Sequence, residues 1–543
     1  MKKIYIITLS AALTGFTLKA AEISSIKKIA PASKISLTGC SQTSAQADLD
    51  ISNVRARMLG GGDMWWDMVG SPAYEVPKGS GKTSFFAGSI WIGGLDAGGN
   101  IKTACQNYRQ SGNDYWAGPI DPSTGNITSA NCLAYDRHWK LDKSDVVNFV
   151  NTGATVPDII SYPGNSPYAS TTPLAPYFDN NGDGTYNYLD GDYPYFNLSS
   201  GTPDCCDILH GDQCIWWVIN DVGNVKTNTN TPTIGIEIHC QAFAFATTSD
   251  AINNATFYQY KMINKSSETY TQFYFGQWVD ADLGYYLDDF VRCDAGKGVG
   301  FCYNGDLIDD LPDGYGATPP VIGIDILHGP LADAGDGIDN NRNGTIDELN
   351  EDITMSKFVY YNNNANPVNG EPNLGPDYYN YLKGVWKNNV KMTYGGDGTM
   401  GTDTCDFMFP GTTDPLHPVN WTEESIPNVP YDRRFIMSAG PFTILPGEVN
   451  CITLGAIWAR AATGDNLASI PLMLEADSIN QLFFNSCFTI LPTSVNQLTE
   501  GNITGIAPNP FSEKTVIHFN NPKGENYSFK LFDVNGTLVK NTS

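Results

Sequence analysis

The sequence predicts a mainly β protein, built of packed antiparallel β-sandwich units with few helices. Its 543 residues include 54 glycines, 32 prolines and 28 tyrosines, a composition that favours turns and strands over long helices. Several segments alternate apolar and polar residues with the period of two that marks a half-buried strand. Hydrophobic residues make up 41% of the chain and charged residues only 17%, which excludes a disordered composition.

Three segments carry the strand prediction. Residues 84–106 indicate two strands joined by a turn at 96–99, where glycines supply positive φ. Residues 256–278 indicate a second hairpin, and residues 441–461 a third that turns at 446–447. The second hairpin places three apolar side chains on one face: Tyr258, Tyr260 and Met262. Each hairpin has one apolar face to cover, which favours sheets packed as a sandwich.

Only two segments have a helical pattern. In residues 143–153, Ser144 is a suitable N-cap and Gly153 a suitable stop. Residues 470–487 carry one apolar stripe that we expect to pack against a sheet. The stripe consists of Leu472, Ala476, Ile479, Leu482, Phe483 and Ser486.

The N-terminus has the pattern of an export signal. Lys2 and Lys3 precede a short apolar run, and the small residue Ala20 offers a cleavage site before Ala21. The run is too short to span the hydrocarbon core of a membrane, so we expect no integral membrane segment after cleavage. The "LTGC" that ends at Cys40 resembles a lipoprotein acylation box, but Lys27, Lys28 and Lys34 lie between it and the apolar run.

The sequence divides into five parts. Residues 1–20 are the predicted signal peptide, followed by a polar linker over 21–48. Residues 49–491 form the β-rich body, which at this length we expect to hold two packed sandwich units. A second linker, 492–502, precedes a small C-terminal unit at 503–543.

The net negative charge of the chain indicates which kinds of ligand it can bind. The chain has 58 acidic and 32 basic residues, a net charge of -26 and a pI near 4.4. Such a surface repels phosphate backbones and anionic lipids, so the sequence argues against binding to nucleic acid. Divalent cations are its natural complement, and we expect calcium as the cofactor.

One stretch, "DNNGDGTYNYLD", has the spacing of a calcium loop. Its oxygen-bearing residues fall at positions 1, 3, 5, 7, 9 and 12: Asp179, Asn181, Asp183, Thr185 through its carbonyl, Asn187 and Asp190. Gly184 at position 6 lets the chain turn back around an ion. Position 12 holds Asp in place of the longer Glu, and the flanks are not helical, so we expect an isolated loop and no helix-loop-helix sensor.

A second stretch repeats this spacing, with Gly344 again at position 6. Its candidate ligands are Asp339, Asn341, Asn343, Thr345 and Asp347. Position 12 is Asn350, which leaves Glu348 or Glu351 to close the site. The segment resembles the DG-x-DN-x-x-x-G-x-x-DE metal-binding repeats of bacterial surface proteins. A third candidate has no template. The segment that follows a predicted strand holds five carboxylates, which require a counterion if they converge: Asp280, Asp282, Asp288, Asp289 and Asp294.

The cysteines allow two interpretations. All 12 follow the signal peptide, and an even number outside the cytoplasm suggests disulfides of undetermined connectivity. Cys206, His210 and Cys214 would share one face of a helix as zinc ligands, with Cys205 as a spare thiolate. Gly211 argues against that helix, so the sequence favours disulfides here.

Catalytic signatures are missing, and we predict no catalytic residue. The chain has no G-x-S-x-G and no H-E-x-x-H, and its phosphate-loop-like "GSGKT" has Val76 where that motif needs glycine. Paired tryptophans at 65–66 and 216–217 leave a second function class open, a polysaccharide-binding or polysaccharide-hydrolysing protein with an aromatic platform beside an acidic pair.

Two resemblances suggest where the protein is located and how it is exported. "PNPF" at 508–511 and "FKLFDVNGTLV" at 529–539 resemble the first half of the C-terminal sorting domain of type IX secretion in Bacteroidota, a small β-sandwich that is only partial here. The body, in "GGDMWWD", "GQWVDADLGYYLDDF" and "DRRFIMSAGPFTILPGE", resembles a group of large exported proteins of the same bacteria. These resemblances imply the type IX machinery as a partner, and a secreted or outer cell surface location.

Together these patterns predict a calcium-stabilised β-sandwich protein with a structural or adhesive role. Its expected partners outside the cell are a polysaccharide or a surface protein.

Overall fold

The computed structural model describes residues 39–168, 172–196, 198, 205–426 and 428–489, and the backbone alone of four strands between 503 and 542. The predicted signal peptide, most of the first linker and the second linker lie outside the described residues. The four C-terminal strands form two antiparallel pairs, β24 (Ile503–Ala507) with β25 (Val516–Phe519) and β26 (Phe529–Phe532) with β27 (Leu538–Thr542).

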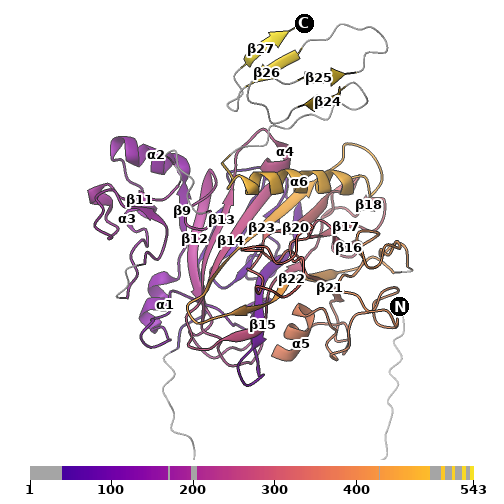
Figure 1. Ribbon diagram of the computed structural model, residues 1–543, viewed down its shortest axis with the longest axis horizontal. Helices are drawn as coiled ribbons and strands as arrows, with labels where there is room; N and C mark the ends of the chain where they lie inside the picture. The colour runs from indigo at the N-terminus through magenta and orange to yellow at the C-terminus, as the bar shows by residue number, and fades with distance from the viewer. Residues whose placement is uncertain are drawn as a thin grey trace, which may run out of the picture. The chain divides into compact units, whose positions relative to one another are not determined.

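The body is built from two large antiparallel sheets (Figure 1). The ten-stranded sheet has the order β21 (Lys357–Asn362), β22 (Arg433–Ile444), β15 (Tyr270–Asp280), β6 (Ala87–Leu95), β3 (Asp63–Met64), β2 (Arg55–Leu59), β4 (Tyr74–Glu75), β5 (Thr83–Phe85), with β1 (Gln46–Leu49) beside β2 and β7 (Ile101–Cys105) beside β6. The nine-stranded sheet has the order β16 (Asp289–Asp294), β17 (Val299–Asn304), β20 (Val321–His328), β23 (Val449–Ala459), β14 (Ala255–Asn264), β13 (Ile236–Ala244), β12 (Gln213–Asn220), β8 (Trp116–Ala117), with β9 (Trp139–Asp142) beside β12.

Short elements complete the body. Two small strand pairs are β10 (Tyr177–Phe178) with β11 (Tyr193–Pro194) and β18 (Ile308–Asp309) with β19 (Gly316–Ala317). The helices are α1 (Ser129–Tyr135), α2 (Lys143–Thr152), α3 (Pro157–Ile160), α4 (Asp250–Asn253), α5 (Gly375–Leu382), α6 (Ile470–Asn485) and the 3₁₀ turn η1 (Tyr188–Asp190). The predicted mainly β class with few helices is thus confirmed.

The two sheets share one hydrophobic core. Tyr258, Tyr260 and Met262 of β14 point into it and are each 1% exposed, as the period-2 pattern predicts. From the segment after β3, Trp65 donates its indole N–H to the Tyr258 hydroxyl (2.9 Å) and stacks on Phe85. Residues of both sheets belong to this one cluster, so the sheets form the layers of a sandwich. This arrangement does not locate the predicted boundary between two sandwich units within 49–491, which stays a prediction.

Two predicted hairpins are wrong in one instructive respect. The 84–106 segment does form the hairpin of β6 and β7. The 256–278 segment, however, places β14 in the nine-stranded sheet and β15 in the ten-stranded sheet. The 441–461 segment divides in the same way between β22 and β23. Both turns are therefore corners where the chain changes layer, and alternation of apolar residues cannot distinguish a corner from a hairpin because it reports only which face is buried.

The long helix α6 covers the outer face of the nine-stranded sheet and runs across β20 and β23 (Figure 1). Its buried face differs from the predicted stripe, because Leu472 is 41% and Leu482 61% exposed. Two polar residues take their place: Asp477 faces Asp325 of β20, and Asn480 donates to the Ala251 carbonyl (2.9 Å). The buried positions are Ile470, Met473, Ala476, Asp477, Asn480 and Phe483.

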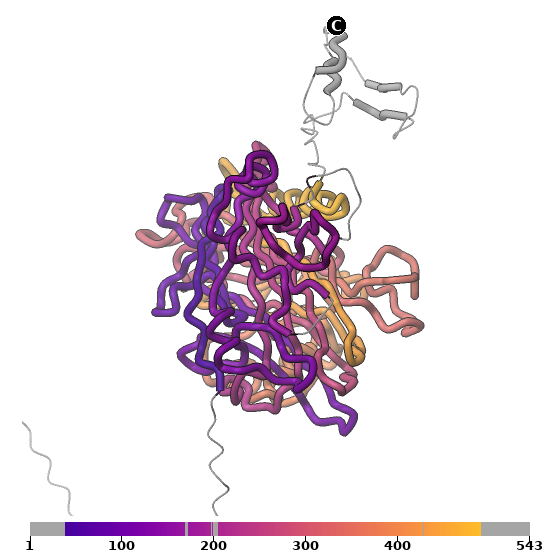
Figure 2. The backbone as a smooth tube through the Cα atoms, turned by 90° about the vertical axis from the view of Figure 1, so that its left-hand side faces the viewer, coloured from indigo at the N-terminus to yellow at the C-terminus, as the bar shows by residue number. Residues whose placement is uncertain are grey.

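The other predicted helix forms as α2. Its stop at Gly153 is confirmed, since Gly153 has φ 75 and donates to the Phe149 carbonyl, but its N-cap is Asp142 and not Ser144. This helix and its neighbours α3 and β11, turned toward the viewer in Figure 2, cover a second area of the outer sheet face around Trp216. Within the described residues, no helix combines the length and the apolar content that crossing a membrane needs.

Candidate functional site

The loop at 179–190 is held between paired strands. β10 and β11 join its ends through the pair Phe178 and Tyr193. The Asp179 carboxylate accepts the N–H of Gly182 (2.7 Å) with Oδ1 and that of Gly184 (2.7 Å) with Oδ2. These donors lower the pKa of Asp179, the Gly184 N–H most of all, so its carboxylate stays ionised in the folded loop.

Two further side chains of this loop bond back to its backbone. Asn181 Oδ1 accepts from the Asp183 N–H (3.0 Å), and Asp183 Oδ1 accepts from the Thr185 N–H (2.8 Å). At its end, Asn187 donates to Asp190 Oδ2 (2.6 Å). The predicted ligands thus lie on one coiled stretch, and three of them, Asp179, Asn181 and Asp183, accept backbone N–H groups from within it.

One residue that supports this loop was missed by the sequence reasoning. Asp192 is 0% exposed and accepts the N–H groups of Asn180 (2.9 Å) and Asn187 (2.8 Å). It therefore fixes both ends of the loop without belonging to the ligand pattern. An acidic residue two positions beyond the twelve-residue motif was its only sequence signal.

The loop at 339–350 has the same internal bonds. Asp339 Oδ2 accepts from Gly344 (2.9 Å), Asn341 Oδ1 from Asn343 (3.0 Å) and Asn343 Oδ1 from Thr345 (2.8 Å). In both loops these hydrogen bonds join the side chain at position 1 to the backbone N–H at position 6, position 3 to position 5, and position 5 to position 7. The sixth-position glycines have φ 77 and 92, a region that favours glycine.

Of the two residues predicted to close the second loop, Glu348 is the one that contacts other predicted ligands. Its Oε1 accepts from the side-chain amides of Asn341 (2.9 Å) and Asn343, and the first of these bonds lowers the pKa of Glu348. Glu351 faces the backbone instead, accepting the N–H of Asn340. Asp347 accepts from the Gly337 N–H (3.1 Å). The side chains at positions 3 and 5 therefore converge on a carboxylate, although position 12 is an asparagine.

The third predicted group divides in two. Asp280 and Asp282, at the end of β15, lie with Asp432, and one carboxylate oxygen of each lies within 4.8 Å of the others. We call these three residues the acidic cluster. Asp288 and Asp289 instead hold backbone, because Asp288 accepts from the Asp310 N–H (3.1 Å) and Asp289 from the Leu283 N–H (2.9 Å).

Strand register explains the acidic cluster. Asp280 pairs with Arg434 across β15 and β22, and Asp282 and Asp432 each lie two residues from that pair, just beyond the ends of the two strands. Arg434 contacts Asp280 (3.1 Å), Asp432 (2.7 Å) and Glu371 (3.1 Å). Asp432, Arg434 and Glu371 were not singled out from the sequence, since only the folded chain brings them near Asp280.

Burial dominates the electrostatics of this cluster. It raises the pKa of Asp280 to about 6, although Arg434 opposes the shift, and it raises the pKa of Asp282 well above its ordinary value. Burial also raises the pKa of Glu371 to about 7. Asp288 follows the same rule, with a pKa of about 7 caused mainly by burial.

The cysteines form three disulfides among the described residues: Cys40–Cys132, Cys205–Cys487 and Cys206–Cys451. Cys214 is a buried thiol of β12, so the zinc set of Cys206, His210 and Cys214 is not assembled. His210 instead places Nε2 2.7 Å from the Cys205 carbonyl. The alternative of disulfides is the correct one at this segment.

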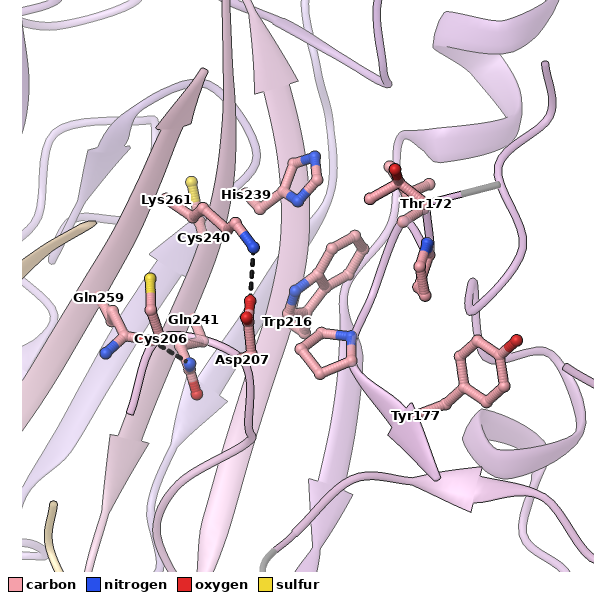
Figure 3. A pocket seen from close by; sticks show the side chains of 13 residues that line it. Thr172, Tyr177, Cys206, Asp207, Trp216, His239, Cys240, Gln241, Gln259 and Lys261 are labelled. Atoms are coloured by element: carbon pink, nitrogen blue, oxygen red, sulfur yellow. Dashed lines mark hydrogen bonds and ion pairs between the residues drawn. The ribbon is translucent and has the colours of Figure 1, made fainter. Parts of the chain in front are cut away.

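A groove lies on the nine-stranded sheet beside the 172–177 segment. Figure 3 shows Trp216, His239, Gln241, Gln259 and Lys261 lining it, next to the loop that carries Asp207. Its polar side chains pair with one another. The pairs are Gln241 with Gln259 (2.6 Å), Lys261 with Asp207 (2.5 Å) and His239 with Glu237 (2.8 Å). A ligand in this groove would have to replace these bonds.

Stacking on a sugar needs an exposed aromatic face, and the tryptophans do not supply one. All 11 are described and none is more than 6% exposed. Trp216, which borders the groove, is 2% exposed, and Trp65 and Trp66 lie in the core. The tryptophans are therefore used for packing.

The chain matches no protein-family model, and no curated protein matches it either.

Proposed function

We propose that this chain is a secreted or cell-surface, calcium-stabilised β-sandwich protein with a structural or adhesive role, exported by the type IX route. One observation carries the proposal. Two loops far apart in the sequence, 179–190 and 339–350, fold with the same three side-chain-to-backbone bonds around a sixth-position glycine.

Two further features support this role. Three disulfides suit an oxidising compartment, and no described tryptophan is exposed for ligand stacking. Calcium bound at each loop would rigidify a connection that is otherwise rich in carboxylates, at the millimolar concentrations found outside cells. The chain would then act as a durable scaffold toward a surface polysaccharide or protein.

The test is thermal unfolding with millimolar calcium and with excess chelator. We expect calcium to raise the melting temperature, because ligand binding to the folded state alone adds about 1 to 3 kcal/mol per site at ten to a hundred times Kd. The double variant Asp179→Ala/Asp183→Ala should lose the part of the rise due to the first loop. The matched control Asp207→Ala removes an exposed carboxylate outside both loops and should keep the full rise. Identical curves for the parent with and without calcium would refute the proposal.

A further inference from the structure

We infer that the acidic cluster of Asp280, Asp282 and Asp432 is a binding site for a hard divalent cation, separate from the two exposed loops. Its three carboxylate oxygens lie within 4.8 Å of one another. Two ligands of one calcium ion, each about 2.3 to 2.6 Å from it, can be no farther apart than about 5 Å. The observed spacing therefore fits around a single ion without any movement of the backbone.

The charge balance calls for a cation. Arg434 is the one guanidinium that contacts the cluster in the described structure, and it also serves Glu371. The neighbouring Arg433 is taken by Glu423 (2.9 Å), and Arg55 at the nearby cavity by Glu75 (2.9 Å). The three carboxyl groups of the cluster and that of Glu371 are thus balanced by the single positive charge of Arg434. They lie in a largely buried place, where an uncompensated charge is costly.

An unused ligand atom points to the same conclusion. Asp280 is 1% exposed, and its Oδ2 accepts from Tyr108 and from Arg434. Its Oδ1 is buried and has no hydrogen-bond partner among the described residues. A buried carboxylate oxygen without a partner is rare in folded proteins and is explained when an ion takes that place.

Access and selectivity follow from the surroundings. Asp282 is half-buried and lines a cavity of about 450 Å³, together with Glu75, Thr83, Tyr286 and Asp313. An ion can therefore reach the cluster from solvent on its Asp282 side. All three ligands are carboxylate oxygens, with no thiolate or imidazole among them, so the chemistry selects calcium, manganese or magnesium over zinc or copper.

The test uses the full chain with both exposed loops disabled by Asp183→Ala and Asn343→Ala, titrated with calcium by calorimetry. We expect one remaining site. In this background Asp282→Asn should weaken binding at least tenfold. The matched control Asp288→Asn changes a neighbouring acid that lies outside the cluster and should leave affinity unchanged. In chelator, Asp282→Asn should melt no lower than its parent, because it removes one of the crowded charges, so a loss of binding would not reflect misfolding.

Terbium gives a second readout. Trp278 lies 5.4 Å from Tyr108, which contacts Asp280, so an ion in the cluster should show luminescence excited through tryptophan. No calcium bound to the loop-disabled chain, or equal binding by the Asp282→Asn and Asp288→Asn variants, would overturn the inference. The proposed loop function fails separately, if disabling the loops leaves the number of bound ions unchanged.

Discussion

The exposed loops and the acidic cluster place carboxylates in opposite environments. At 179–190 the backbone N–H groups of Gly182 and Gly184 stabilise the ionised Asp179 and lower its pKa. In the cluster, burial raises the pKa of Asp280, and Arg434 divides its contacts among three acids, Asp280, Asp432 and Glu371. An exposed loop can therefore keep its carboxylates ionised without a cation, whereas the buried cluster needs a proton, an arginine or a metal ion.

The largest effect should come from Arg434→Met. This change removes the only cation that contacts the cluster in the described structure, and breaking a buried pair costs about 3 to 5 kcal/mol. Denaturant unfolding in chelator should show this loss, and calcium should restore part of it. Arg137→Met is the matched control: its pair with Asp158 (2.8 Å) is partly exposed and should be worth less than about 1 kcal/mol. Equal losses for the two variants would break the comparison.

Disabling both loops should have the next largest effect. With millimolar calcium, Asp183→Ala/Asn343→Ala should lower the free energy of unfolding by about 2 to 4 kcal/mol, since two binding sites are lost. In chelator the same variant should differ from the parent by less than about 1 kcal/mol, because the changed side chains are exposed. A loss of the same size in chelator would mean that the loops act through their own hydrogen bonds and not through an ion.

The pH dependence should separate buried from exposed acids. Burial raises the pKa of Asp477 to about 6, where it faces Asp325 and Lys297. A raised pKa means that the folded state holds the proton more tightly, so this contribution is full below the unfolded value near 4 and is lost as pH rises through 6. We expect Asp477 to contribute a fall in stability of about 3 kcal/mol across that window, and Asp477→Asn to remove this share of the total fall in denaturant unfolding measured at several pH values.

Asp179 should show the opposite sign. Its lowered pKa contributes stability above the ordinary value near 3.8, and that contribution disappears as the solution is acidified below it. Asp179→Asn should therefore flatten the acid limb of the stability profile and leave the window near pH 6 unchanged. If both variants alter the same window, the assignment of buried and exposed acids is wrong.

The smallest effect should come from Asp190→Glu. A longer side chain at position 12 can ligate calcium with both oxygens, and we expect a several-fold gain in affinity, about 1 kcal/mol. Calcium titration of this variant and of the matched control Asp207→Glu measures it. No gain would indicate that Asp190 is not the closing ligand of its loop.

Much of the fold could be predicted because it depends on local pattern. Alternation identified the buried face of β14, and Gly153 identified the end of α2. The two corners at β14–β15 and β22–β23 could not be predicted, since the choice between hairpin and change of layer depends on which sheet receives the next strand. The stripe of α6 failed because Asp477 and Asn480 are buried through partners on other elements.

The candidate sites divide in the same way. Each of the two loops is one continuous stretch of sequence, so the spacing of its candidate ligands could be taken directly from the sequence. Glu348, which contacts Asn341 in the second loop, was among the predicted closing residues. Two of the three residues of the acidic cluster, Asp280 and Asp282, were among the predicted ligands. Its third carboxylate, Asp432, directly precedes β22, the strand that pairs with β15, and no local pattern links it to Asp280.

The most direct test of calcium stabilisation is the number of calcium ions bound by the full chain, measured by calorimetric titration after chelation. The account predicts one ion for the 179–190 loop, one for the 339–350 loop and one for the acidic cluster, with the first two lost in Asp183→Ala/Asn343→Ala. A chain that binds no calcium at millimolar concentration, and melts at the same temperature with and without it, would contradict the account.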